Sequence, residues 1–528
     1  MTIRKSKVNI YQLLLVLVIV LAVFLRFYRV EETFSIIFDT ARDLEAVRKI
    51  IVDKKLTLLG PHTSVGLWSV RETYFGPLHY YLILPPLILF KMDPIGPVIF
   101  TGITNLASGF VLFLLLRDLL KNKWLSLMFF VLYLLSPIAV QYSRFFWNPN
   151  FLPLFVSLTL WLFWLFIKSG KKIFIWLVGL AAGLSFQLHY ITLSIFLVII
   201  SMPLVFLKER RRLMSKFVYS FYSFSGFLFG ILPIILFELR HKLFLTGSVI
   251  FHLFSGKDVD FHFPPSLAWL YFRSMIGRFL GMTDYSLISM VDRYSWMDLI
   301  YSIISLLLFS SIFFLKRFLK EKEKIFAVSL MLVIFLGIVS GVLWSTAGKS
   351  RIEDRYFLPL IIPYFVLLAF SVDLILKIVE QKRKFCLLVS CLTAMALFLS
   401  LKKDFFIINE RIGIDEYHVN FSGAKTISSI ISKDVNENRL EGKFNVANII
   451  DGNTRATYYR YFLELNQTPA MAVEQYPQAE VLYVLSKNEA DFVINYPVWE
   501  ISSFTPREIV DQWQGPYGVK IFKLEKGE

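Results

Sequence analysis

Charged residues are scarce in this chain. Asp, Glu, Lys and Arg make up 18% of its 528 residues, whereas 56% of the residues are hydrophobic. Soluble domains usually carry about 25% charged residues and a smaller apolar fraction. The scarcity of charge therefore excludes an ordinary soluble protein and indicates a chain that lies largely in a lipid bilayer.

The chain contains two cysteines, and its N-terminal run is not expected to be a cleaved signal peptide. Cys386 and Cys391 lie in one apolar run, with neither a disulfide nor a metal-site spacing, so we expect both to be small core residues. The first apolar run, Val8–Tyr28, is too long for a signal peptide, and no small-residue cleavage site follows it. We predict that it is a retained first helix.

Long apolar runs recur along the first four hundred positions. Each of them can cross a hydrocarbon core of about 30 Å as a helix. The sequence predicts eleven spans: Val8–Tyr28, Ile95–Leu116, Trp124–Gln141, Phe151–Ile167, Ile173–Leu188, Tyr190–Leu207, Phe217–Phe237, Leu299–Leu315, Ile325–Leu343, Tyr356–Leu376 and Phe385–Leu401.

One further apolar stretch, Leu78–Phe90, contains Pro85 and Pro86. A helix of this length rises only about 20 Å, which is too little to cross. If the stretch does not cross, the basic N-terminus and five later basic loops all fall in the cytoplasm, as the positive-inside rule favours. We therefore predict an interfacial or re-entrant piece on the outer side, with residues from Lys402 onward outside the membrane.

The net charge of +16 follows the same pattern, because Lys and Arg cluster in short loops between apolar runs. This distribution is typical of membrane topology and not of a groove for phosphates, so we expect no nucleic-acid partner. The predicted division is a membrane domain at 1–401, with a first outer loop at 29–94, and an extracytoplasmic α/β domain at 402–528. In the latter, we predict strands at Phe444–Ile450, Val481–Leu485 and Val519–Leu524 and a helix at Thr454–Leu465.

Ionisable residues avoid the middles of the predicted spans, which weakens a transporter interpretation. They gather instead in the predicted outer loops, interleaved with aromatic residues such as Trp68, Tyr74 and Tyr142. This combination suits a carboxylate base, an anion site and aromatic platforms for a sugar.

Several stretches resemble a known superfamily. They are Phe-Asp-Thr-Ala-Arg-Asp at Phe38–Asp43, Leu-Leu-Gly-Pro-His-Thr-Ser at Leu58–Ser64, Tyr-Phe-Gly-Pro-Leu-His-Tyr-Tyr at Tyr74–Tyr81, Tyr-Ser-Arg-Phe-Phe-Trp-Asn-Pro-Asn at Tyr142–Asn150, Gln-Leu-His-Tyr at Gln187–Tyr190 and Glu-Asp-Arg-Tyr-Phe-Leu-Pro-Leu at Glu353–Leu360. In order and spacing they resemble GT-C membrane glycosyltransferases of the family 39 type, which include protein O-mannosyltransferases and lipid A aminoarabinose transferases. The segment Asp451–Leu463 resembles the tail of a bacterial branch of that group.

The resemblance implies that an acidic residue of the first outer loop lies at the reaction centre, and Asp39 has the matching position. It also implies a sugar donor on a polyprenyl phosphate and inversion at the anomeric carbon. Two departures leave the acceptor open. The aminoarabinose transferases place a lysine before a Pro-Pro pair where this chain reads Tyr-Phe-Gly-Pro. The mannosyltransferases have Asp-Glu where it has Asp39-Thr40, so Asp43, one helical turn on, is the candidate second carboxylate.

The predicted roles fall into three groups. Asp39, with Asp43, is the catalytic base; Arg144, Arg355 and Arg42 bind the donor phosphate; Glu72, His79, Trp147, Asn148, His189, Glu353 and Tyr356 contact substrate. We expect no cofactor, since a monophosphate leaving group needs no metal, although a divalent metal stays open. Structural alternatives are an N-cap for Asp39, a salt bridge of Asp43 with Arg42 or Arg48, interfacial anchoring for Arg144 and Arg355, and simple packing for His189.

The sequence therefore predicts a polytopic α-helical membrane protein with about eleven transmembrane helices, GT-C-like, that transfers a hexosyl or pentosyl group at the plasma (inner) membrane. The expected partners are a polyprenyl-phosphate sugar, membrane lipids and an acceptor that is a protein, a lipid-linked glycan or a cell-envelope polymer. The alternative is a lipid-linked sugar flippase or polysaccharide export component without transferase activity. A non-catalytic scaffold is a third possibility, which leaves the carboxylates and arginines on one rim unexplained.

Overall fold

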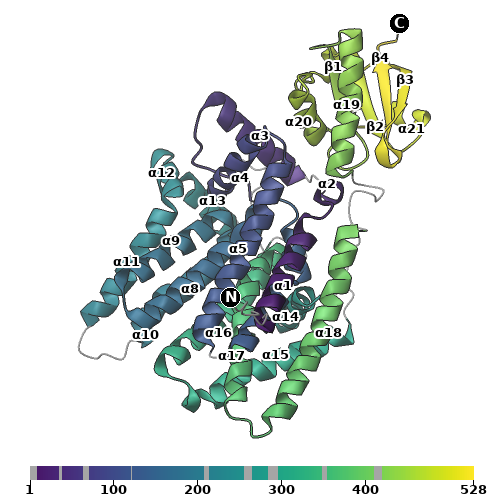
Figure 1. Cartoon of the computed structure of the whole chain (residues 1–528). Coiled ribbons are helices and arrows are strands. Elements are labelled where there is room, and N and C mark those ends of the chain that lie inside the picture. Colours follow the sequence, from purple (N-terminus) through teal and green to yellow (C-terminus); the bar gives the residue numbers. More distant parts are fainter. Residues whose placement is uncertain are drawn as a thin grey trace, which may run out of the picture. The chain divides into compact units, whose positions relative to one another are not determined.

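The computed structural model of the protein describes residues 9–34, 38–63, 71–120, 122–206, 213–254, 264–282, 295–347, 354–409 and 419–527 (Figure 1). The chain forms two compact units. The helical unit contains Met1–Phe27, Leu56–Ile83 and Val98–Phe405, and the C-terminal unit contains Tyr28–Lys55, Leu84–Pro97 and Phe406–Glu528. Two pieces of the predicted first outer loop therefore belong to the same compact unit as the predicted α/β domain.

Seven helices in the described residues are long and apolar enough to cross a membrane. They are α1 (Ile10–Phe27), α5 (Ile95–Leu119), α8 (Leu152–Ser169) with the preceding 3₁₀ turn, α15 (Trp296–Phe314), α16 (Glu321–Ala347), α17 (Ile361–Leu376) with its preceding turn, and α18 (Lys382–Asn409). Each of the seven corresponds to a predicted span.

The other four predicted spans are shorter or broken. One is the pair α11 (Leu213–Gly230) and α12 (Leu232–Arg240), which is bent by 69°. The remaining three are the shorter apolar helices α6 (Lys123–Leu134), α9 (Lys172–Leu188) and α10 (Leu193–Phe206). A multi-pass helical membrane protein is thus confirmed.

Proline explains where the predicted span Trp124–Gln141 breaks. Helix α6 ends at Leu134, and the short helix α7 (Pro137–Tyr142) begins at a proline. Ser136 has extended backbone, because the ring of a following proline disfavours the helical conformation. Another proline pair has a different outcome: helix α4 (Leu78–Leu89) continues through Pro85 and Pro86. Its 12 residues rise about 18 Å, less than the hydrocarbon thickness.

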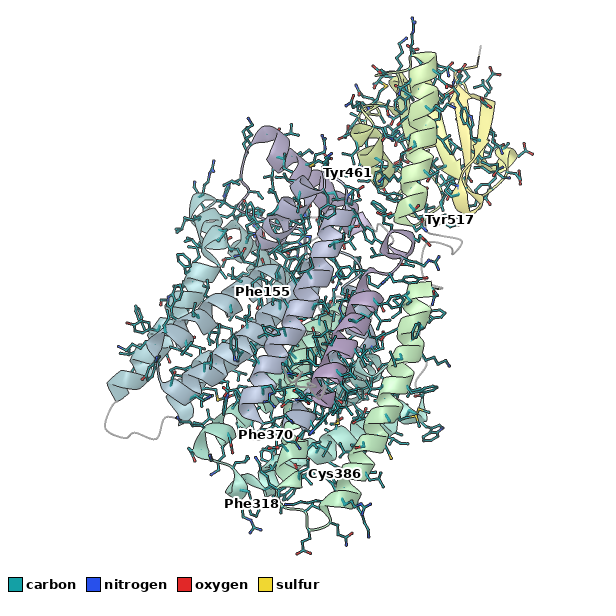
Figure 2. The ribbon with its side chains drawn as sticks, viewed as in Figure 1. Phe155, Phe318, Phe370, Cys386, Tyr461 and Tyr517 are labelled. Carbon is teal, nitrogen blue, oxygen red and sulfur yellow. The ribbon has the colours of Figure 1, made fainter. Side chains whose placement is uncertain are left out.

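Packing in the helical unit places α17 at the centre. Its apolar window is 89% buried, whereas the windows of α1 and α18 are 17% and 11% buried. Cys386 (labelled in Figure 2) and Cys391 are both exposed on α18, so the prediction that they are core residues is wrong. Most of the apolar surface of α18 faces outward. The prediction failed because a helix that is hydrophobic on all sides does not reveal from its sequence which face packs against the protein.

Small residues bring α9 and α11 together. Gly179 and Gly183 of α9 face Gly226 and Gly230 of α11, and a Cβ at Gly179 would lie 1.9 Å from the carbonyl oxygen of Ser223. Glycine spaced by four lets helix backbones approach this closely in membranes. The helical unit also contains α13 (Phe244–Phe254) and α14 (Pro265–Phe279).

The C-terminal unit is built on a four-stranded sheet in the order β1-β2-β4-β3. The strands are β1 (Phe444–Asn448), β2 (Val481–Ser486), β3 (Glu508–Gln514) and β4 (Lys520–Glu525), and the helices are α2 (Val30–Thr33), α3 (Phe38–Asp53), α19 (Phe421–Asn438), α20 (Thr457–Leu465), α21 (Ala490–Ile494) and α22 (Trp499–Ser502). β1 and β2 are parallel and completely buried, whereas β4 pairs antiparallel with β2 and β3. The predicted α/β fold of this region is confirmed.

Candidate functional site

The first group of predicted site residues lies on α3, in the C-terminal unit. Arg42 Nη1 lies 2.9 Å from Asp39 Oδ1, and Arg42 Nη2 lies 2.8 Å from Asp43 Oδ1. Asp43 is fully buried, while about a third of the Asp39 side chain is exposed. Asp39 is the second residue of α3, inside its first turn, where the helix dipole favours a negative charge. The structure therefore brings Asp39, Arg42 and Asp43 together, with the arginine between the two carboxylates.

In the helical unit, two of the sequence motifs contact each other directly. The amide of Gly76 donates to the carbonyl of Gln187 at 3.0 Å, and the amide of Leu78 donates to the Gln187 side chain at 3.2 Å. A Cβ at Gly76 would lie 2.5 Å from Gln187 Cγ, so only glycine permits this approach. The Tyr-Phe-Gly-Pro and Gln-Leu-His-Tyr stretches, more than a hundred positions apart, thus form one structural element.

Glu72 is held beside this element. The Tyr74 hydroxyl donates to Glu72 Oε2 at 2.6 Å, and His62 Nδ1 lies 3.4 Å from the same oxygen. Burial, together with Glu72, raises the pKa of Tyr74 to about 12, so this hydroxyl keeps its proton and acts as a donor at neutral pH. The carbonyl of Tyr74 in turn accepts from the hydroxyl of Tyr190.

Four predicted residues gather near Arg355. Its guanidinium carbon lies 5.5 Å from the ring centre of Trp147 and 5.3 Å from that of Tyr356. The His189 ring is 5.8 Å from the Tyr356 ring in an edge-on arrangement. Asn148 donates from Nδ2 to the carbonyl of Leu188 at 2.7 Å, next to His189. Three turns of the chain, which follow α7, α9 and α16, supply this group, which we call the Arg355 group.

His189 is a neutral member of the Arg355 group. Burial and the positive charge of Arg355 lower its pKa from 6.5 to about 3. Its Nδ1 accepts a hydrogen bond from the amide of Ile191 at 3.3 Å, which leaves the proton on the other ring nitrogen. Neutral His189 therefore contributes a hydrogen-bond donor and a ring face to the group, but no charge.

Arg144 lies in a different environment. Its Nη1 donates to the carbonyl of Leu25 at 2.6 Å, and the charges of Arg26 and of the fully buried Asp404 act on it. Burial and Arg26 lower the pKa of Arg144 to about 10, so it remains a cation at neutral pH. Arg26 itself donates to Asn105 Oδ1 at 2.8 Å and to the carbonyl of Leu134 at 3.0 Å. We call Arg26, Arg144, Asp404 and Asn105 the Asp404 group.

Two predicted site residues remain. His79 is fully buried on α4, with its ring 5.9 Å from that of Phe151. Glu353 lies outside the described residues. Within the described ranges, no three His, Cys, Asp or Glu residues are grouped so that they could hold a metal ion.

The sequence did not single out Arg26, Asp404 or Gln187 as site residues. Arg26 and Asp404 stand near the ends of apolar runs, where a charge ordinarily indicates topology. The one available signal was that each is an ionisable residue beside an apolar run. Such a residue needs a partner if it faces the protein interior. Gln187 was part of a motif, but its contact with Gly76 depends on tertiary structure.

Comparisons with known proteins agree with this architecture. No family model matches the chain, and no curated protein matches it in sequence. The structure of ArnT from Cupriavidus metallidurans bound to undecaprenyl phosphate is 12% identical, covers 96% of this chain and 97% of its own, and gives a TM-score of 0.58. The same protein in the apo state is 10% identical, covers 98% of each chain and gives a TM-score of 0.59. The chain thus shares its fold with these two ArnT structures.

Proposed function

We propose that the protein is a membrane glycosyltransferase that moves a sugar from a polyprenyl phosphate to an acceptor hydroxyl on the outer side of the plasma membrane. One observation carries the proposal: in this fold, three separate turns gather Arg355, Trp147, Tyr356, Asn148 and the neutral His189. The bound undecaprenyl phosphate of the ArnT structure is a lipid of the class that such a group would recognise.

The Arg355 group has side chains that can bind both the phosphate and the sugar of the donor. A guanidinium can bind a phosphate through two parallel hydrogen bonds, which makes arginine well matched to a leaving phosphate. Trp147 and Tyr356 flank the guanidinium and restrict its orientation. The half-buried Trp147 ring can also stack against a sugar face, and Asn148 and His189 supply neutral polar groups for its hydroxyls.

Asp39 is the proposed general base that activates the acceptor hydroxyl. In the proposed single displacement, Asp39 accepts the proton of the acceptor hydroxyl as its oxygen bonds to the anomeric carbon. The bond from that carbon to the phosphate oxygen breaks, and its electron pair leaves with the polyprenyl phosphate, whose charge Arg355 stabilises. General-base catalysis of this kind contributes about 10²–10⁴-fold. Arg42, between Asp39 and Asp43, holds the base in place.

A donor and acceptor screen tests the proposal. Purified full-length protein in detergent is incubated with a panel of polyprenyl-phosphate sugars, each with a Ser- and Thr-rich peptide, a lipid-linked glycan or a cell-wall polymer. Mass spectrometry should find free polyprenyl phosphate and a glycosylated acceptor for at least one pair, in equal amounts. A reaction without acceptor controls for hydrolysis.

The alternative function gives the opposite result. If every donor stays intact in the screen, while vesicles that contain the protein expose a lipid-linked sugar on their other leaflet, the protein is a flippase and the transferase proposal fails. Such a result would also leave Asp39 without a chemical role.

A further inference from the structure

The C-terminal unit joins the segment that carries Asp39 to the α/β domain at several points. The amide of Phe421, at the start of α19, donates to the carbonyl of Phe34 at 2.7 Å, and their rings are 5.8 Å apart. Asn420 Nδ2 donates to the carbonyl of Glu32 at 2.6 Å. The chain just before α3 is therefore fastened to the first turn of α19.

The second loop piece, Leu84–Pro97, is held by α19 and by α20 of the domain. The hydroxyl of Tyr461, labelled in Figure 2, donates to the carbonyl of Met92 at 2.6 Å. Lys425 Nζ lies 2.9 Å from Asp93 Oδ2. One contact comes from α20 and one from α19, so the domain holds both loop pieces at once.

A side-chain ion pair joins helix α3 to the α/β domain. Arg48 Nη2 lies 2.7 Å from Glu464 Oε2 at the end of α20, and both side chains are 28% exposed. Arg48 Nε also lies 3.1 Å from Glu45 Oε2, which fixes its direction. Arg48 follows Asp39 by nine residues on one helix, a rise of about 14 Å, so a shift of this pair moves the whole helix.

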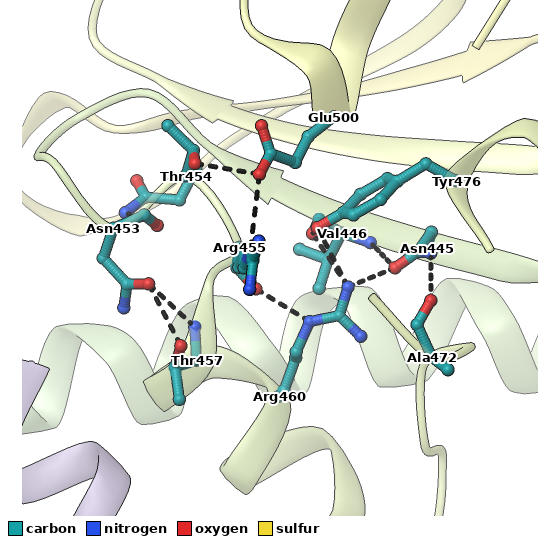
Figure 3. A network of polar contacts seen from close by, with 11 residues as sticks. Asn445, Val446, Asn453, Thr454, Arg455, Thr457, Arg460, Ala472, Tyr476 and Glu500 are labelled. Atoms are coloured by element: carbon teal, nitrogen blue, oxygen red, sulfur yellow. Dashed lines mark hydrogen bonds and ion pairs between the residues drawn. The ribbon is translucent and has the colours of Figure 1, made fainter. Parts of the chain in front are cut away.

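Helix α20 is in turn locked to the sheet by Arg460 (Figure 3). The guanidinium of Arg460 donates to the carbonyl of Met471 at 2.6 Å and to the Tyr476 hydroxyl at 3.0 Å. It also donates to the side chain of Asn445 on β1. Arg460 and Glu464 both lie on α20, so this helix connects the sheet to Arg48. A helix docked in this way has few ways to move independently.

We propose that the α/β domain is a positioning element for the catalytic helix, and that Arg48 and Glu464 are its positioning residues. The domain would hold α3 so that Asp39 and Asp43 keep the orientation that transfer needs. The inference rests on the proposed function for its catalytic consequence. The docking of α3 on α20 is independent of that function and can be measured without substrate.

The test uses charge reversal in the full-length protein. The variants are Arg48→Glu, Glu464→Arg and the double variant that restores an ion pair with its signs exchanged. Hydrogen exchange of the α3 amides reports docking, and kcat and KM for transfer report positioning. We expect each single variant to speed α3 exchange and to lower kcat about tenfold with KM changed less, since small misplacements of a catalytic group are costly. The double variant should recover both measurements to within about threefold of wild type.

A matched control is the exposed pair Lys443–Glu480, 3.2 Å apart in the same domain and away from α3. The same reversals there should leave α3 exchange and kcat at wild-type values. The inference is overturned if the single variants at Arg48 and Glu464 leave exchange unchanged, if exchange rises while kcat does not fall, or if the double variant fails to recover. A wild-type protein that transfers no sugar would contradict the proposed function instead, and the exchange comparison would still decide whether α20 holds α3.

Discussion

Two arginines of the helical unit were both predicted to bind donor phosphate, and the structure gives them different surroundings. Arg144 donates to a backbone carbonyl and shares a buried region with Arg26 and the carboxylate of Asp404. Arg355 lies against the rings of Trp147 and Tyr356. A backbone hydrogen bond holds a buried arginine in place, whereas aromatic faces orient a guanidinium without neutralising its charge.

The different surroundings indicate different roles for the two arginines. Asp404 is fully buried, neither of its oxygens has a hydrogen-bond partner among the described residues, and the charges of Arg26 and Arg144 offset only part of the cost of its burial. We therefore expect Arg144 to act mainly in stability and Arg355 mainly in transfer.

The largest expected effect is on stability. Arg144→Ala should lower the free energy of unfolding by about 3–5 kcal/mol, because it empties a buried site and removes the hydrogen bond to the carbonyl of Leu25. Thermal melting in detergent measures the change. Arg383→Ala, an exposed arginine of α18, is the control and should melt like wild type. Equal melting of the Arg144 variant would show that Arg144 is not structural.

The next effect is on activity. Arg355→Ala should reduce kcat/KM by about 10²–10³-fold, the usual loss when one fixed group that stabilises transition-state charge is removed, and should leave the melting temperature nearly unchanged. Arg317, whose guanidinium lies 4.8 Å from the Phe318 ring (labelled in Figure 2), offers a matched arginine over an aromatic ring. Arg317→Ala should retain full activity. If Arg355→Ala melts early and transfers normally, the assigned roles are reversed.

A smaller effect concerns pH. Above pH 6.5, His189 is neutral in the folded and the unfolded protein and contributes no pH dependence. Because its folded pKa is about 3, the unfolded chain alone takes up this proton as the pH falls below 6.5, so stability decreases. At pH 5 this amounts to about 2 kcal/mol. His189→Gln should flatten the melting curve against pH in this window; an unchanged slope would mean that His189 is protonated in the folded state.

The smallest effect tests the aromatic contact. Trp147→Ala should raise KM for the donor several-fold, since a cation–π contact contributes about 0.5–2 kcal/mol. Trp147→Phe keeps a ring over Arg355 and should recover most of the loss. Steady-state kinetics at varied donor concentration separates the two variants. Equal KM values for both would show that the ring does not orient Arg355.

Much of the fold was accessible from the sequence, because apolar length and the charge of short loops depend on local composition. Seven of the eleven predicted spans correspond to helices long and apolar enough to cross a membrane, and the other four correspond to shorter or bent helices. The strands Phe444–Asn448, Val481–Ser486 and Lys520–Glu525 lie where the apolar runs predict them. Strand β3 was missed because it is an exposed edge strand rich in polar residues, and it lacks the apolar alternation by which strands are recognised.

The candidate site was accessible only as a set of residue types. Motif resemblance proposed Asp39, Arg355 and His189 as site residues, but it could not show that the charge of Asp404 acts on Arg144, since the two residues are far apart in the sequence. The Gly76–Gln187 contact and the Arg48–Glu464 pair are likewise long-range, and no local pattern encodes them. Local sequence predicts which groups are present, and packing decides which of them meet.

The central claim is that Asp39 is the base of a sugar transfer from polyprenyl phosphate. The most direct measurement compares release of free polyprenyl phosphate from a labelled donor by wild type, Asp39→Asn and Asp53→Asn, the last being the same substitution at the exposed end of the same helix. We predict that Asp39→Asn is expressed and folded but releases about 10²–10⁴-fold less lipid phosphate, while Asp53→Asn matches wild type. Full release by Asp39→Asn would contradict the account.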